Sequence, residues 1–70
     1  MESVESVDFM NSTLLNEISK YSDYNKIHLN IGFTKWKEST DMNEKDLYDL
    51  LKLKSFRQAA SLLELYARKQ

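Results

Sequence analysis

The sequence predicts a small α-rich domain that ends in a two-helix corner, with α+β as the alternative through one short strand or hairpin at residues 27–36. Three patterns indicate this fold class: apolar residues at helical spacing near the N-terminus, alternating apolar residues in the middle, and a change of helical phase near the C-terminus. The 70 residues form a single domain, 1–70, close to the smallest size at which one apolar core stabilises a fold.

The first predicted helix runs from Asp8 to Tyr21, after a lead-in at residues 1–6 that is expected to be frayed. Its apolar face consists of Met10, Leu14, Ile18 and Tyr21, which have the spacing of an amphipathic helix. Ser6 or Asp8 is the expected cap. The turn-forming residues at 22–25 are expected to end the helix.

The middle of the chain changes to a period of two. Ile27, Leu29, Ile31 and Phe33 alternate with smaller or polar residues, which is typical of a half-buried strand. Such a strand needs a partner, either elsewhere in this chain or in a second copy of it. A helix over about 24–38 is the competing interpretation, and the strand is preferred because Gly32 and the β-branched residues are poor helix formers.

Trp36 is out of phase with this alternation and lies between Lys35 and Lys37. In an extended segment its side chain would point away from the apolar face, and an exposed tryptophan is a common anchor of protein interfaces. A bulge at Gly32 would instead turn Trp36 into the core. Both interpretations are open at this stage.

The C-terminal part contains two helical runs with different apolar faces. Leu47, Leu50 and Leu51 form the first face, and Phe56, Ala59, Ala60, Leu63 and Tyr66 form the second. In one straight helix these faces would differ by about 150°, so a turn is predicted near Lys52–Ser55. Asn43 is the predicted cap of the first helix, and Ser55 is the predicted cap of the second.

The composition argues against several function classes. The chain has no cysteine and one glycine, which excludes thiolate metal sites and glycine-rich phosphate loops. His28 is the only histidine, so neither a catalytic site nor a metal site is expected. No secretion signal or membrane span is recognised. We therefore expect a cytoplasmic protein that is not an enzyme, has no cofactor or small-molecule substrate, and does not bind membranes.

The preferred function is that of a protein-interaction module, a regulator or inhibitor of the kind frequent in phages and mobile elements. Leu53, Leu62 and Leu65 fall outside the main apolar faces and are predicted, with Trp36, to bind another protein or a second copy of this chain. Charge is also uneven: residues 1–24 hold five carboxylates and one lysine, whereas residues 51–70 hold five cations and one carboxylate.

The alternative function is DNA binding. The segment Lys54-Ser-Phe-Arg-Gln-Ala-Ala-Ser-Leu-Leu-Glu-Leu resembles the opening helix of helix-turn-helix regulators, in which a turn and a recognition helix follow. Only five residues remain after it, so the motif would have to be shifted, with 44–53 as its first helix and 56–69 as its second. The resemblance then implies a dimeric DNA-binding regulator. Its DNA contacts would come from Lys52, Lys54, Arg57, Gln58, Ser61 and Arg68.

Overall fold

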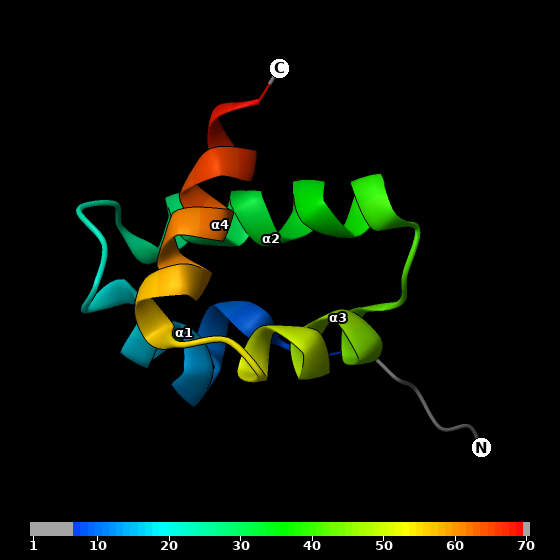
Figure 1. Cartoon of the computed structure of the whole chain (residues 1–70), viewed down its shortest axis with the longest axis horizontal. Coiled ribbons are helices and arrows are strands. Elements are labelled where there is room, and N and C mark those ends of the chain that lie inside the picture. The colour runs from blue at the N-terminus through cyan, green and yellow to red at the C-terminus, as the bar shows by residue number, and fades with distance from the viewer. Residues whose placement is uncertain (1–6, 70) are drawn as a thin grey trace.

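The structure is a computed structural model that describes residues 7–69, and within this range every regular element is helical (Figure 1). The elements in chain order are a short 3₁₀ helix η1 (Phe9–Asn11), then α1 (Thr13–Ser19), α2 (Lys26–Thr40), α3 (Glu44–Lys52) and α4 (Phe56–Arg68). The prediction of an α-rich domain is confirmed. The α+β alternative is wrong for the described residues. The frayed lead-in expected at residues 1–6 lies outside them.

The N-terminal helix begins later than the sequence indicated. Ser12, rather than Asp8, caps α1, because its hydroxyl oxygen accepts a hydrogen bond from the backbone N–H of Leu15 at 3.0 Å. The same hydroxyl donates to the carbonyl oxygen of Phe9 at 2.7 Å. Asp8 instead precedes η1, where its carboxylate accepts from the side-chain amide of Asn11 at 2.8 Å.

The strand predicted at residues 27–33 is wrong, because this segment lies within α2. The side-chain oxygen of Asn25 accepts from the N–H of His28 at 2.9 Å and caps the helix. Residues four apart also share a helix face, so the alternating apolar residues divide into two pairs. Leu29 and Phe33 are buried, whereas Ile27 is 64% exposed and Ile31 is 42% exposed.

Trp36 lies in the core and is 7% exposed. The interpretation of Trp36 as an exposed interface anchor is therefore wrong. Its ring meets that of Phe33 edge to face at 6.3 Å between centroids, and Phe33 in turn stacks on Phe9 at 4.1 Å. Helical spacing, and not a bulge at Gly32, brings Trp36 onto the same face as Phe33.

Helix α4 crosses α2, and the two backbones approach closely at Gly32. Figure 1 shows α4 running across the front of α2, with α1 and α3 toward the bottom of the view. A Cβ atom added at Gly32 would lie 2.0 Å from the carbonyl oxygen of Leu63. Gly32 is thus required by a backbone-to-backbone contact between helices, which explains a glycine inside a helix.

The predicted corner between the C-terminal helices is confirmed. Helix α3 ends at Lys52, α4 begins at Phe56, and three residues connect them. Ser55 and Gln58 form a reciprocal capping box, in which each side chain accepts from the other's backbone N–H. Both helices direct an apolar face into one core, whose buried members here are Leu47, Leu51, Ala59, Ala60 and Leu63.

Candidate functional site

The α3–α4 corner leaves large apolar side chains in solvent. Leu53, in the turn, is 82% exposed, the highest value among the large apolar residues that the structure describes. Beside the turn, the rings of Tyr21 and Phe56 lie 5.7 Å apart between centroids, and these residues are 47% and 38% exposed. We call the surface formed by Tyr21, Lys52, Leu53, Lys54, Phe56 and Arg57 the corner surface.

The cations of the corner surface differ in their surroundings. The Lys52 ammonium lies 3.4 Å from a carboxylate oxygen of Asp49 and 5.1 Å from the centre of the Tyr48 ring. Lys54 and Arg57 are exposed, and neither forms an ion pair with a carboxylate among residues 7–69. The corner surface therefore carries two positive charges that this part of the chain does not neutralise.

Asp49 is held by two lysines on α3. The Lys45 ammonium donates to one carboxylate oxygen of Asp49 at 2.7 Å, and the Lys52 ammonium lies 3.4 Å from the other oxygen. The hydrogen bond from Lys45 is the largest cause that lowers the pKa of Asp49 below its ordinary value of 3.8; desolvation opposes this effect, and Lys52 adds to it. Asp49 is therefore ionised at neutral pH and paired with Lys45 and Lys52. It forms no ion pair with Lys54 or Arg57.

This pKa can be checked by a carboxyl titration followed by NMR. We expect the Asp49 midpoint below 3.8, and we expect Lys45→Gln to raise it more than Lys52→Gln does. Because the folded pKa is depressed, the stabilisation from this carboxylate is present at neutral pH and is lost as pH falls through the folded pKa. A wild-type midpoint at or above the ordinary value would contradict the arrangement.

The leucines predicted to bind a partner do not form one patch. Leu53 lies in the turn, whereas Leu65 is 48% exposed in the C-terminal half of α4. Leu62 is half-buried and packs against the core. Of the three, Leu53 alone belongs to the corner surface.

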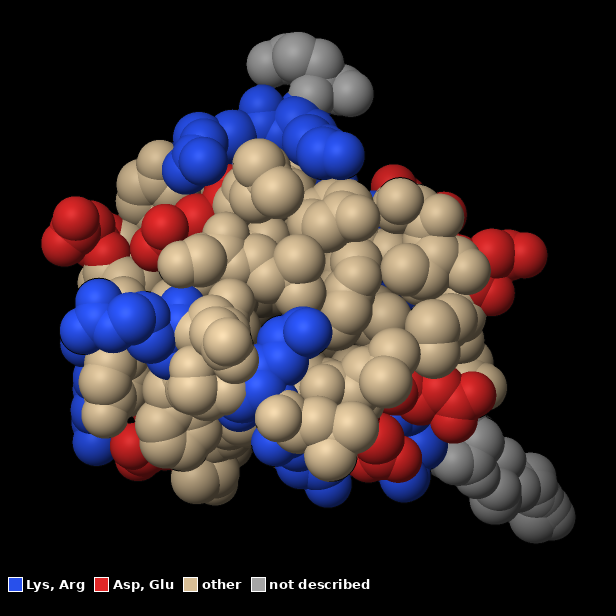
Figure 2. Space-filling model, viewed as in Figure 1, with Lys and Arg blue, Asp and Glu red and all other residues tan. Residues whose placement is uncertain are grey.

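The residues predicted to contact DNA are also dispersed. Arg57, Gln58 and Ser61 are exposed in the first half of α4, but the Gln58 side chain accepts from the backbone N–H of Ser55 in the capping box. Arg68 lies at the other end of α4, where it donates to the Tyr24 hydroxyl at 3.4 Å. Figure 2 shows Lys and Arg side chains in several separate groups on the face in view.

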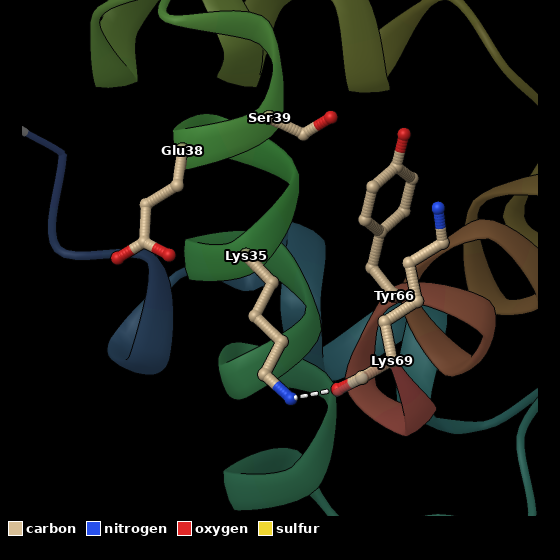
Figure 3. A pocket seen from close by; sticks show the side chains of 5 residues that line it. All are labelled: Lys35, Glu38, Ser39, Tyr66 and Lys69. Carbon is tan, nitrogen blue, oxygen red and sulfur yellow. Dashed lines mark hydrogen bonds between the residues drawn. The ribbon is translucent and has the colours of Figure 1, made fainter.

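A hollow away from the corner surface lies between the C-terminal parts of α2 and α4 and is lined by Lys35, Glu38, Ser39, Tyr66 and Lys69 (Figure 3). The Lys35 ammonium donates to the backbone carbonyl oxygens of Lys69 and Ala67. Lysine near a helix C-terminus satisfies carbonyls that have no partner within the helix. This hollow thus contains a structural contact between α2 and the end of α4.

Sequence reasoning missed the Tyr21–Phe56 pair because it assigned both residues to buried faces. Tyr21 lies just beyond α1, and Phe56 is the first residue of α4. Side chains at helix ends are only partly covered by neighbouring helices, so these terminal positions were the available signal. The contact between them joins segments 35 residues apart in the sequence.

Residues 7–69 contain one histidine and no cysteine. His28 lies against the ring of Tyr24 at 4.6 Å between centroids. Within this range no three His, Cys, Asp or Glu side chains form a group that could hold a metal ion. No helix in it is long and apolar enough to cross a membrane. Comparisons with protein-family models, curated proteins and solved structures found no match to the chain.

Proposed function

We propose that this chain is a non-enzymatic protein-interaction module, a cytoplasmic regulator or inhibitor that binds another protein through the corner surface. The observation that carries the proposal is the 82% exposure of Leu53, in the turn whose residues Lys54 and Ser55 line a hollow with Tyr21 and Phe56. Fully burying a leucine side chain contributes about 1.5–3 kcal/mol. Aromatic side chains are enriched among the residues that dominate interface energies, so this small surface has suitable anchors.

The test is to replace Leu53 by serine. Since Leu53 contributes almost nothing to the core, we expect the free energy of unfolding to change by less than about 0.5 kcal/mol. Affinity for the partner should fall by about tenfold or more, which is the burial contribution of one leucine. The measurement is capture of proteins from a lysate of the native host, with cross-linking and mass spectrometry to locate the contact.

Ile27→Ser is the matched control, because Ile27 is also an exposed aliphatic residue but lies on α2. It should leave capture unchanged. Equal capture by wild type and Leu53→Ser would exclude the corner surface as the interface. Leu65→Ser shows whether the interface extends along α4, and light scattering shows whether the partner is a second copy of the chain.

A dimeric helix-turn-helix-like DNA-binding regulator is the second candidate. The observation that favours it is the three-residue connection between α3 and α4, which is the length typical of that motif. Arg57, Gln58 and Ser61 are also exposed near the start of α4, where a recognition helix contacts DNA. Fluorescence anisotropy with duplex DNA separates the candidates, because DNA affinity falls steeply with salt through counterion release, whereas an apolar interface depends little on salt.

A further inference from the structure

The corner surface contains an open hollow in which every charged side chain is positive. Its lining residues are Tyr21, Lys52, Lys54, Ser55, Phe56 and Arg57. The Tyr21 and Phe56 rings supply apolar surface, and three cations surround it. A ligand that inserts an apolar group against the two rings therefore places the groups on either side of it next to the ammonium and guanidinium groups.

Two of these cations are available to a partner. Lys54 and Arg57 have no carboxylate partner among residues 7–69, whereas Lys52 is shared between Asp49 and the Tyr48 ring. Lysine and arginine bind carboxylates through charge-assisted hydrogen bonds, and arginine can hold both oxygens at once. The surface is therefore complementary to a ligand with two carboxylates beside an apolar group.

We propose that the corner surface binds an acidic amphipathic segment of a partner protein. One aromatic or leucine side chain of that segment enters the hollow against Tyr21 and Phe56, and acidic residues on either side of it pair with Lys54 and Arg57. This inference rests on the proposed function and adds the chemistry of the partner. It also explains why exposed apolar side chains and cations without a carboxylate partner among residues 7–69 occur at the same turn.

A protein segment fits this surface better than a nucleic acid does. Phosphate groups would also neutralise Lys54 and Arg57, but nucleic-acid affinity comes largely from many phosphate contacts, on the order of 6–10 in a strongly salt-dependent DNA binder. Three cations line this hollow. Leu53, 82% exposed in the same turn, offers nothing to a phosphate backbone but suits an apolar side chain of a protein.

The test is selection of peptides from a random display library on the purified full chain. We expect enriched peptides to contain an aromatic residue or leucine flanked by Asp or Glu. The double variant Lys54→Glu with Arg57→Glu should bind these peptides about tenfold more weakly, as expected for the loss of two exposed ion pairs. Phe56→Ala should weaken them as well.

The matched control is Arg68→Glu with Lys69→Glu, which makes the same change in net charge at the opposite, C-terminal end of α4. Arg68, the last residue of α4, lies about 16 Å from Arg57 along the helix, and Lys69 follows it, so the control should keep wild-type affinity. An equal loss in both double variants would show that net charge alone attracts the peptides, and would overturn the inference.

Other outcomes separate this inference from the proposed function. Enriched peptides without acidic residues that still require Leu53 and Phe56 would overturn the acidic partner and leave the protein-binding surface intact. A different outcome is that no peptides are enriched, while a single-stranded oligonucleotide binds the wild type but not the Lys54→Glu and Arg57→Glu variant. That outcome would overturn both the acidic partner and the proposed protein-binding function. Circular dichroism of every variant confirms that losses of binding do not come from unfolding.

Discussion

Replacing Gly32 by alanine should destabilise the protein by about 3 kcal/mol or more, because the added methyl group would overlap a backbone carbonyl across the α2–α4 contact. The Cβ atom would lie 2.0 Å from the oxygen of Leu63 and 2.8 Å from its carbonyl carbon. The two helices would have to separate to accommodate it. A domain of this size is stabilised by about 4–10 kcal/mol in total, so the loss is a large fraction of the stability.

The measurement is urea denaturation followed by the fluorescence of Trp36, which is buried in the folded protein and is the chain's single tryptophan. Thr34→Ala is the matched control, since it introduces alanine at an exposed position of the same helix. It should be neutral or slightly stabilising, as helix propensity predicts. Propensity alone predicts that Gly32→Ala stabilises α2, so a more stable variant would contradict the close crossing.

Leu29→Ala should cost about 2–5 kcal/mol, whereas Ile27→Ala should change stability by less than about 0.5 kcal/mol. Leu29 is fully buried and Ile27 is 64% exposed, although the two residues are only two positions apart. In a strand they would share one face, and both substitutions would have similar costs. Thermal and urea unfolding of the two variants therefore tests the conformation of this segment directly.

Similar losses in the two variants would favour the strand over the helix. Conversely, a large loss confined to Leu29→Ala would place Leu29 in the core and Ile27 in solvent, as in α2. The loss of stability in Ile31→Ala provides a third comparison. Its side chain is 42% exposed, and its cost should lie between the other two.

The sequence was sufficient to predict the α3–α4 corner because the relevant signals are local. The change of apolar phase, the cap at Asn43 and the cap at Ser55 all depend on residues within a few positions of one another. The structure contains both caps: Asn43 accepts from the N–H of Asp46 at 2.8 Å, and Ser55 accepts from that of Gln58 at 3.1 Å. The boundaries of these helices followed from the same signals.

The strand predicted for the middle segment is wrong because the local pattern of this segment fits two structures. Apolar residues at every second position also include pairs four apart, so Leu29 and Phe33 satisfy a strand and a helix equally well. The deciding information is tertiary. Gly32 appeared to disfavour a helix, but its role depends on the main chain of Leu63, which is 31 positions away.

The candidate site was predicted in part. The sequence indicated the corner, the cations Lys54 and Arg57, and an extra leucine at 53. It did not indicate that Tyr21 completes this surface, because the contact of Tyr21 with Phe56 depends on how α1 packs against α4. Burial of Trp36 likewise follows from the helical conformation of residues 26–40, whereas an extended segment would have buried Trp36 only with a bulge at Gly32.

The backbone contact at Gly32 also limits how this protein can evolve. The atom that excludes a side chain there is the carbonyl oxygen of Leu63, which every amino acid carries. No replacement of Leu63 can therefore create the missing space, and the two positions have no reason to covary. A lineage that lost this glycine would have to move a whole helix, so glycine should persist at position 32 while the residue at 63 drifts among apolar types.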